Sequence, residues 1–503
     1  MKFSFSNNIT ENNVIYFRRD NWDDFGWKTY FNVYYNQVYL GDFRIVKIIN
    51  NEGCNVTWNE LEKDDLLDKV LTEKLPDNYY SLSREATYQN LYKLLSPEDV
   101  NGLLTDIRDV SFNLSLLDNV EDTYIYSNSL IRGINTTYLR ETLSKISQKI
   151  TDDKTNFDIY YPNEKWKMHF QNEINAILPS NLYAIIGNNG VGKTRILRDL
   201  AIAILNSTNN KYSYYFNKNT NFYINNRSKI SSIIYISLSP FDIPNSEFIE
   251  MFNSPKNPGQ DKISTIKNIA VLLKDGTSKI IDQIFGAQFL DLLHTKEKIE
   301  KIKLIIINFS WDQDLNNFFN EILNPNLINK EDGTANYNKI DEIKKELQIF
   351  SSGQKYIVII LLTIIENIVE KSMLIIDEPE DFLHPPYVAA LINTISSILR
   401  KVKGLGIIAT HSDVVLQELP KDHVYHLEKD RTVSTPSIQT FAADVSLINR
   451  EIFGIQLQNT GYYNFLKDLA QNDREKAQQL LNSKNGELGE SGKFYLSLLL
   501  SNI

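Results

Sequence analysis

Apolar and polar positions alternate in the first part of the chain and then change their spacing. From about Val14 to Ile49 the alternation runs through many aromatic and β-branched residues, which predicts an antiparallel sheet. From about Trp58 to Gln148 the apolar spacing becomes helical, for example over Leu61–Lys74 and Ala86–Leu95. The pattern therefore predicts a region over residues 1–151 that is rich in strands and then helical.

Short, continuous apolar runs follow, and they predict buried strands. These runs are Ala184–Ile186, Ile233–Leu238, Met373–Ile376 and Gly406–Ala409. A longer apolar run, Tyr356–Ile365, is too short to cross a bilayer and predicts a core helix. We expect one domain over residues 152–440, with a largely helical insertion at about 245–345, and then a helical tail over residues 441–503.

Composition narrows the class of protein. The 503 residues carry 53 Lys and Arg against 63 Asp and Glu, a formal net charge of −10, which disfavours nonspecific duplex binding by the surface as a whole. The net charge does not exclude a local basic groove. Cys54 is the only cysteine, which leaves no disulfide framework, and the first residues turn polar before a secretory signal could develop. We therefore expect a cytoplasmic protein with no membrane segment.

The strongest chemical motif is Gly-Asn-Asn-Gly-Val-Gly-Lys-Thr at residues 187–194, between a predicted strand and a predicted helix. Its glycines let successive backbone amides turn toward a phosphate, and the start of the next helix adds a positive dipole end. A lysine and a hydroxyl at the end of such a loop reach the β/γ-phosphates and Mg²⁺. We predict that ATP is bound by Gly187, Asn188, Asn189, Gly190, Val191, Gly192, Lys193, Thr194 and Arg195. Lys193 would also act in catalysis, and Thr194 would hold the metal.

Two acids end the apolar run that begins at Met373. In this arrangement Asp377 can hold Mg²⁺ and Glu378 can polarise the attacking water. His411 follows the next apolar run, where it is either a structural histidine or a sensor of the γ-phosphate. The segment Phe350–Lys355 stands directly before the core helix and, taken alone, is an ordinary capped helix start.

Taken in this order, the motifs resemble the ABC class of P-loop ATPases over roughly residues 152–430. The resemblance implies that Glu378 is the general base, that His411 is the switch histidine, and that His384 stands at the D-loop position. It also implies that Ser352, Gly353 and Gln354 form a signature loop, which binds the ATP held by a second copy of the chain.

The sequence departs from the ABC pattern at one motif. The expected Q-loop glutamine is missing after Ile236, and Ser239 or Asp242 are the candidates for its place. The run Asp377–Pro385 is similar to that of the OLD-like and AAA bacterial defence branch, which includes the ATPase of the Septu system. The resemblance thus implies an α/β fold, a P-loop NTPase of ABC type with an antiparallel β-subdomain, a helical lobe and an N-terminal β/helical extension.

Three functions stay open at this point. The first is an antiphage ATPase that uses ATP and Mg²⁺, forms a homodimer or a higher oligomer, and regulates a separate effector such as a nuclease. The second is a DNA-repair ATPase of the RecF/SMC kind, which the lack of long heptads disfavours. The third is a transporter ATPase subunit. The tail has no Glu then Asp-x-Asp cluster of a metal-dependent nuclease, so we expect any cleavage to come from a partner, with nucleic-acid binding left open.

Overall fold

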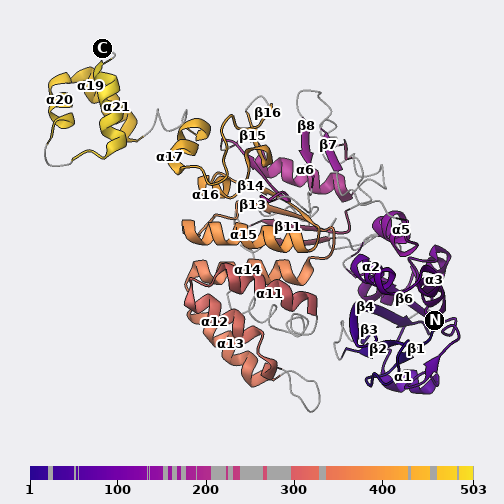
Figure 1. Cartoon of the computed structure of the whole chain (residues 1–503). Coiled ribbons are helices and arrows are strands. Elements are labelled where there is room, and N and C mark those ends of the chain that lie inside the picture. The colour runs from indigo at the N-terminus through magenta and orange to yellow at the C-terminus, as the bar shows by residue number, and fades with distance from the viewer. Residues whose placement is uncertain are drawn as a thin grey trace.

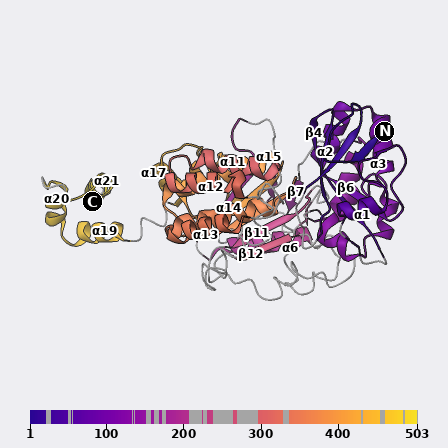
Figure 2. The same ribbon diagram turned by 90° about the horizontal axis from the view of Figure 1, so that it is seen from below.

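The computed structural model has three parts that follow one another along the chain (Figures 1 and 2). The residues that the structure describes are 1–20, 27–49, 53–54, 56–132, 134, 136–150, 157–160, 167–171, 177–188, 190–205, 223–224, 230–237, 264–268, 296–327, 336–428, 432–453, 461–483 and 487–501. Every structural statement below concerns these residues.

The N-terminal part is built on a six-stranded sheet in the order β5-β1-β2-β3-β4-β6. Its strands are β1 (Phe3–Phe5), β2 (Ile15–Arg19), β3 (Tyr30–Tyr35), β4 (Val38–Lys47), β5 (Val70–Leu71) and β6 (Tyr79–Ser83). Its helices are α1 (Trp58–Lys63), α2 (Glu85–Leu94), α3 (Pro97–Asp106), α4 (Thr136–Tyr138) and α5 (Ser144–Ser147). The strands from β2 to β4 are antiparallel, as the alternation predicted. Buried aromatic rings fill the core: Phe5 lies 5.3 Å from Phe17 and 5.5 Å from Phe31 between ring centroids.

Two strands interrupt the stretch predicted to be helical, Trp58–Gln148. Strand β6 pairs with β4, and β5 pairs with β1. All five residues of β6 are buried, so its sequence has no alternation that would separate a strand from a helix. The predicted helix Leu61–Lys74 is wrong beyond Lys63, where α1 ends. Asp65 and Asp68 have φ angles of 58° and 56°, which an α-helix cannot contain.

The central part is built on a seven-stranded sheet in the order β12-β11-β13-β14-β9-β15-β16. Its strands are β9 (Leu182–Ile186), β11 (Ile233–Ser237), β12 (Ser264–Asn268), β13 (Met373–Asp377), β14 (Leu405–Ala409), β15 (Val424–Leu427) and β16 (Val433–Ser434). All neighbours are parallel except β15 and β16. A second, antiparallel sheet consists of β7 (Phe157–Tyr160), β8 (Lys167–Phe170) and β10 (Tyr223–Ile224).

Helices cover both faces of this sheet, as a parallel sheet requires (Figure 1). On one face α6 (Lys193–Leu205) packs against alternate strand residues such as Tyr235 and Ile375. On the other face α14 (Ser352–Asn367) and α15 (Pro385–Lys401) pack against the intervening residues, such as Ile236 and Ile376. The predicted core helix is confirmed, because every residue of Tyr356–Ile365 in α14 is buried.

Three more helices extend the α14 side of the sheet and form the helical lobe. They are α11 (Lys296–Asn308), α12 (Gln313–Ile322) and α13 (Tyr337–Ile349). Leu315, Phe318 and Ile322 bury one face of α12 in the same core as α14. Within the mixed, largely helical stretch expected at about 245–345, Ser264–Asn268 is strand β12. Its backbone pairs in register with β11, a long-range contact that the apolar spacing does not encode.

The predicted boundary at residue 440 does not separate the last two parts. Ile448, in the short helix α17 (Val445–Ile448), is buried in the core around α14 and lies close to α16 (Asp413–Gln417). The separate C-terminal part consists of α19 (Tyr462–Asn472), α20 (Arg474–Leu481) and α21 (Glu490–Ser501). Its small core contains Leu466, Ala470, Ala477 and Leu496, and it stands apart from the central part (Figures 1 and 2).

The N-terminal part meets the central sheet through the first turn of α2. The buried Glu85 carboxylate lies 2.8 Å from Lys371 Nζ and 3.1 Å from Lys403 Nζ. Glu370 accepts a hydrogen bond of 3.0 Å from the backbone N–H of Ala86. Lys371 and Lys403 stand just before β13 and β14, so this contact lies at the amino-terminal edge of the sheet.

The fold class predicted from the sequence is confirmed. The chain has an α/β fold in which the phosphate loop joins β9 to α6, together with a small antiparallel sheet, a helical lobe and an N-terminal β/helical extension. None of the helices in the described ranges is long and apolar enough to cross a membrane.

Candidate active site

Three sequence motifs meet at the carboxyl-terminal edge of the central sheet. Strands β13, β14 and β9 are consecutive neighbours, and all three run in the same direction. Strand β9 leads into the phosphate loop at Gly187, β13 ends at Asp377, and β14 ends two residues before His411. Parallel pairing therefore brings together side chains that lie more than 200 residues apart in sequence.

The phosphate loop has the backbone angles that its glycines were predicted to supply. Gly187 and Gly192 have φ angles of 154° and 104°, which residues with a side chain rarely adopt. A Cβ at Gly187 would lie 2.5 Å from the carbonyl oxygen of Leu427, whereas a Cβ at Gly192 would meet none of the described residues within 4 Å. Packing thus requires the first glycine, while the space beside the second is open to a ligand. Lys193 begins α6, is buried, and donates a 3.1 Å hydrogen bond to the Gly187 carbonyl.

The two predicted metal ligands lie on the same side of the sheet. The side chain of Asp377 follows Met373 and Ile375 on the face that α6 covers, and Thr194 is the second residue of that helix. Asp377 is buried, so its carboxylate points into the protein at the end of β13. A hydroxyl and a carboxylate are hard oxygen donors, which suits Mg²⁺ that keeps several waters and nucleotide phosphates as its other ligands. The residues present fit a phosphate-bound Mg²⁺.

Glu378 and His411 lie beside each other. Oε1 of Glu378 is 3.4 Å from Nδ1 of His411, and both side chains are partly exposed. The hydrogen bond from His411 lowers the pKa of Glu378, so this carboxylate is ionised at neutral pH and can accept a proton. The same bond raises the pKa of His411. Glu378 has a φ of 51°, a strained backbone angle of the kind that clusters at functional sites.

A third acid, Glu380, holds this histidine and was missed by the sequence reasoning. Its Oε1 accepts hydrogen bonds from the Thr410 hydroxyl at 2.6 Å and from the backbone N–H of His411 at 2.9 Å. It also lies 3.5 Å from His411 Nδ1. Burial raises the pKa of Glu380. The only signal in the sequence was a second glutamate after Asp377-Glu378-Pro379, and nothing there connects it to residue 411.

The signature loop begins α14 on the opposite face of the sheet from α6. Ser351 is its N-cap, and Gln354 completes a capping box: the Ser351 hydroxyl accepts from the Gln354 N–H at 3.3 Å, and Gln354 Oε1 accepts from the Ser351 N–H at 3.1 Å. Ser352 is exposed next to this cap. Gly353 lies close to the loop that precedes α15, since a Cβ at Gly353 would lie 3.5 Å from the Phe382 carbonyl oxygen. Gln354 therefore orders the loop, and its contact with nucleotide stays a prediction.

Some predicted residues are not brought to the site by the described contacts. Arg195 lies on α6 and approaches Asp199 in the same helix, 3.8 Å from Nε to Oδ2. His384 is the exposed N-cap residue of α15. Asn189 and the two Q-loop candidates, Ser239 and Asp242, lie outside the described residues. Asn188, Gly190 and Val191 lie in the phosphate loop as predicted, and their contacts with a nucleotide stay predictions.

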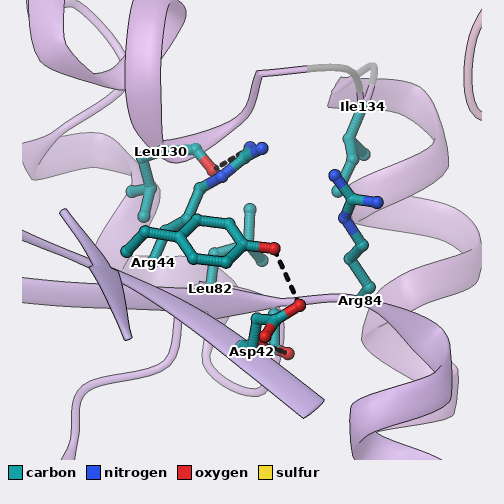
Figure 3. A pocket seen from close by; sticks show the side chains of 8 residues that line it. Asp42, Arg44, Leu82, Arg84, Leu130 and Ile134 are labelled. Atoms are coloured by element: carbon teal, nitrogen blue, oxygen red, sulfur yellow. Dashed lines mark hydrogen bonds between the residues drawn. The ribbon is translucent and has the colours of Figure 1, made fainter. Parts of the chain in front are cut away.

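A separate cavity lies in the N-terminal part (Figure 3). It measures about 240 Å³ including its opening to solvent, and its lining residues are Tyr30, Asp42, Arg44, Leu82, Ser83, Arg84, Leu130 and Ile134. The Tyr30 hydroxyl donates to Asp42 at 2.7 Å, and Arg44 donates to the carbonyl of Arg132 at 2.6 Å. The first bond links β3 to β4 within the sheet, and the second joins the sheet to the segment that covers it, so the polar groups of the cavity have a structural role.

Comparison with known proteins agrees with this geometry. Residues 182–417 match the family described as "AAA domain, putative AbiEii toxin, Type IV TA system". This range includes the phosphate loop, the signature loop, the β13 acids and His411. The chain is also similar to Protein ea59 of Escherichia phage lambda, with 26% identity over 520 residues that cover 98% of this chain and 96% of the phage protein. The family match thus falls on the part of the chain that carries the predicted nucleotide-binding motifs.

Two solved structures show a distant similarity to the chain. One is the SmcHead bound to the C-winged helix domain of ScpA, with 14% identity and a TM-score of 0.28 over 57% of this chain and 98% of that chain. The other is a nucleotide-free ATP-binding cassette from an ABC transporter, with 13% identity and a TM-score of 0.26 over 56% of this chain and 90% of that chain.

Proposed function

We propose that this protein hydrolyses ATP at a site shared by two copies of the chain, and that the nucleotide state regulates a separate effector in antiphage defence. The observation that carries the ATPase is the meeting of the phosphate loop, Asp377, Glu378 and His411 at one edge of the sheet. In this proposal Lys193 and the loop amides bind the phosphates, and Thr194 and Asp377 hold Mg²⁺. The metal, when bound, neutralises charge on the phosphates. Glu378 takes the proton of the attacking water.

His411 is the proposed sensor of the γ-phosphate. Glu380 accepts a hydrogen bond from its backbone N–H, and Glu378 lies 3.4 Å from its Nδ1. Its raised pKa favours the charged form, which suits contact with an anionic phosphate. Because Glu378 and His411 touch each other, a change at the γ-phosphate would reach the general base directly.

The opposite placement of α6 and α14 supports a site shared between two subunits. Each helix presents its N-terminus, the positive end of its dipole, but the two helices cover opposite faces of one sheet. A signature loop on α14 would then meet the γ-phosphate bound by another copy, and the two copies would be related by a two-fold axis. ATP would stabilise the closed dimer because it contacts both loops only in that state.

The proposed regulation of an effector in antiphage defence is supported by sequence similarity and by the matched family. The Asp377–Pro385 run is similar to that of defence-associated ATPases, and the description of the matched family names a toxin–antitoxin system. The tail has no acid cluster of the Glu then Asp-x-Asp kind in its sequence, so we assign cleavage to a partner such as a nuclease. Cytoplasmic location follows from this role.

The test of the proposed function is ATP hydrolysis by the purified chain, with Lys193→Ala and Glu378→Gln as variants. Both variants should lose at least about 100-fold in kcat, since each removes a group that acts at the transferred phosphoryl or on its nucleophile. Glu378→Gln should still bind ATP. Mixing Lys193→Ala with Ser352→Arg should restore part of the activity if one intact site forms from two defective chains. Hydrolysis that survives Lys193→Ala would refute the phosphate loop as the active site, and no recovery in the mixture would refute the shared site.

A further inference from the structure

One carboxylate, Asp312, joins the start of α12 in the helical lobe to the first turns of α14 and α15. Asp312 is the N-cap of α12 and accepts from the Leu315 N–H at 3.0 Å. It accepts from Gln354 Nε2, in the first turn of α14, at 3.2 Å. It also accepts a 2.5 Å hydrogen bond from the Tyr387 hydroxyl in the first turn of α15. Asp312 thus binds Gln354 and Tyr387, which lie 42 and 75 residues further along the chain.

The bond to Asp312 determines how the Gln354 amide is oriented. An ionised carboxylate only accepts hydrogen bonds, so the NH₂ group of Gln354 must face Asp312. Its oxygen is then directed at Ser351, where it accepts from the backbone N–H at 3.1 Å and from the hydroxyl at 3.0 Å. The capping box that orders the signature loop therefore depends on a residue outside α14.

The third helix connects this network to the loop that follows the β13 acids. Tyr387 N–H donates to the His384 carbonyl at 2.9 Å, and the segment before His384 contacts the signature loop where the Phe382 carbonyl approaches Gly353. The ring of Trp311 covers Tyr387, with centroids 5.0 Å apart. Asp312 therefore fixes the signature loop relative to the segment that begins at Glu378.

The protonation states at neutral pH suit this arrangement. Burial alone would raise the pKa of Asp312, but the hydrogen bonds from Tyr387, Leu315 and Gln354 outweigh it and lower the pKa. Burial, together with Asp312, raises the pKa of Tyr387 to about 12. The acid is thus ionised and the phenol remains a donor.

We propose that Asp312 is a positioning residue of the shared ATP site, which holds the signature loop in the orientation that engages the nucleotide of the partner copy. This inference rests on the proposed function. It assigns Asp312 and Tyr387 no contact with ATP. Their effect passes through Gln354 and Ser351 to the exposed Ser352 and the first amides of α14.

The test compares Asp312→Asn with Asp314→Asn in the full chain. Asparagine keeps the size of the side chain and can still cap α12, but it presents an NH₂ group where two donors now meet a carboxylate. Asp314 is an exposed acid in the first turn of the same helix, so its variant makes the same change of charge without the network. Tyr387→Phe removes one donor and leaves the cap unchanged. The readouts are kcat, affinity for a fluorescent ATP analogue, thermal unfolding, and ATP-dependent dimerisation in a Glu378→Gln background.

We expect Asp312→Asn to lower kcat and ATP-dependent dimerisation about tenfold, the usual effect of losing a hydrogen bond to a charged group. ATP affinity of the phosphate loop and the unfolding midpoint should stay near those of Asp314→Asn, and Tyr387→Phe should change kcat in the same direction. Equal kcat in Asp312→Asn and Asp314→Asn would overturn the inference while leaving the ATPase intact. A parallel loss of ATP affinity, or a lower unfolding midpoint that accounts for the lost kcat, would also overturn it. Failure of the wild-type chain to dimerise with ATP would instead refute the proposed function.

Discussion

Glu85 is the clearest place to test how the N-terminal part is held on the ATPase domain. Its side chain is 3% exposed and its carboxylate lies 2.8 Å from Lys371 Nζ, which is 6% exposed. Lys403 lies 3.1 Å away, and Gln89 Nε2 donates to the same carboxylate at 2.8 Å. Glu85→Ala removes the only acid that these contacts share and leaves the buried Lys371 ammonium without its nearest counter-charge.

The expected loss is large because the ion pair is buried. Removing one partner of such a pair costs about 3–5 kcal/mol, mainly from the charge left behind in a poorly solvated site. For a unit of this size, 1 kcal/mol corresponds to roughly 2–4 °C, so the unfolding midpoint of the N-terminal part should fall by roughly 6–20 °C. An exposed pair would contribute at most about 1 kcal/mol.

The assay is thermal unfolding followed by calorimetry, with Glu98→Ala as the control. Glu98 is an acid in the first turn of the next helix, α3, but it is exposed. Its removal should change the free energy of unfolding by no more than about 0.5 kcal/mol. If Glu85→Ala and Glu98→Ala unfold at the same temperature, the contact does not hold the two parts together and the reasoning from burial is wrong.

Three other predictions concern single residues. Both Gly187→Ala and Gly192→Ala should lower the free energy of unfolding, because both glycines have a positive φ. Gly187→Ala should lose about 1–3 kcal/mol more, since its Cβ also meets the Leu427 carbonyl oxygen, whereas Gly192→Ala has no such clash and should also weaken ATP binding. Equal losses of stability in the two variants would contradict this. Burial raises the pKa of Asp109 to about 6, above its unfolded value, so its contribution to stability is complete below about pH 4 and is lost as the pH rises through 6. The stability of wild type relative to Asp109→Asn should therefore improve from pH 7 to pH 5 in urea titrations, and a constant difference would argue against it. Glu380→Gln should lower the pKa of His411 in an NMR titration, because it removes a negative charge 3.5 Å from Nδ1; an unchanged titration would exclude that interaction.

The main chemical motifs could be predicted because each is local in sequence. A glycine-rich loop before a helix requires only consecutive residues, and an apolar run that ends in Asp377 and Glu378 is visible without the fold. The same holds for α14, whose ten consecutive buried residues are almost all apolar. Such segments specify their own secondary structure.

The missed features depend on contacts between distant segments. Strand β12 exists because it pairs with β11, and β6 because it pairs with β4, although neither run alternates clearly in sequence. Glu380 accepts a hydrogen bond from Thr410, 30 residues further along the chain, and Glu85 accepts one from Lys403, 318 residues further along. Apolar spacing describes which face of an element is buried, but it does not say which polar group will lie opposite another.

The shared ATP site is tested most directly by crosslinking two separately tagged chains. In a Cys54→Ser background, one chain carries Asn189→Cys in the phosphate loop, the other carries Ser352→Cys in the signature loop, and both carry Glu378→Gln. The account predicts a crosslink between the two tagged chains that forms with ATP and Mg²⁺ and is lost without nucleotide. No such crosslink, from a protein whose wild-type form hydrolyses ATP normally, would contradict the account.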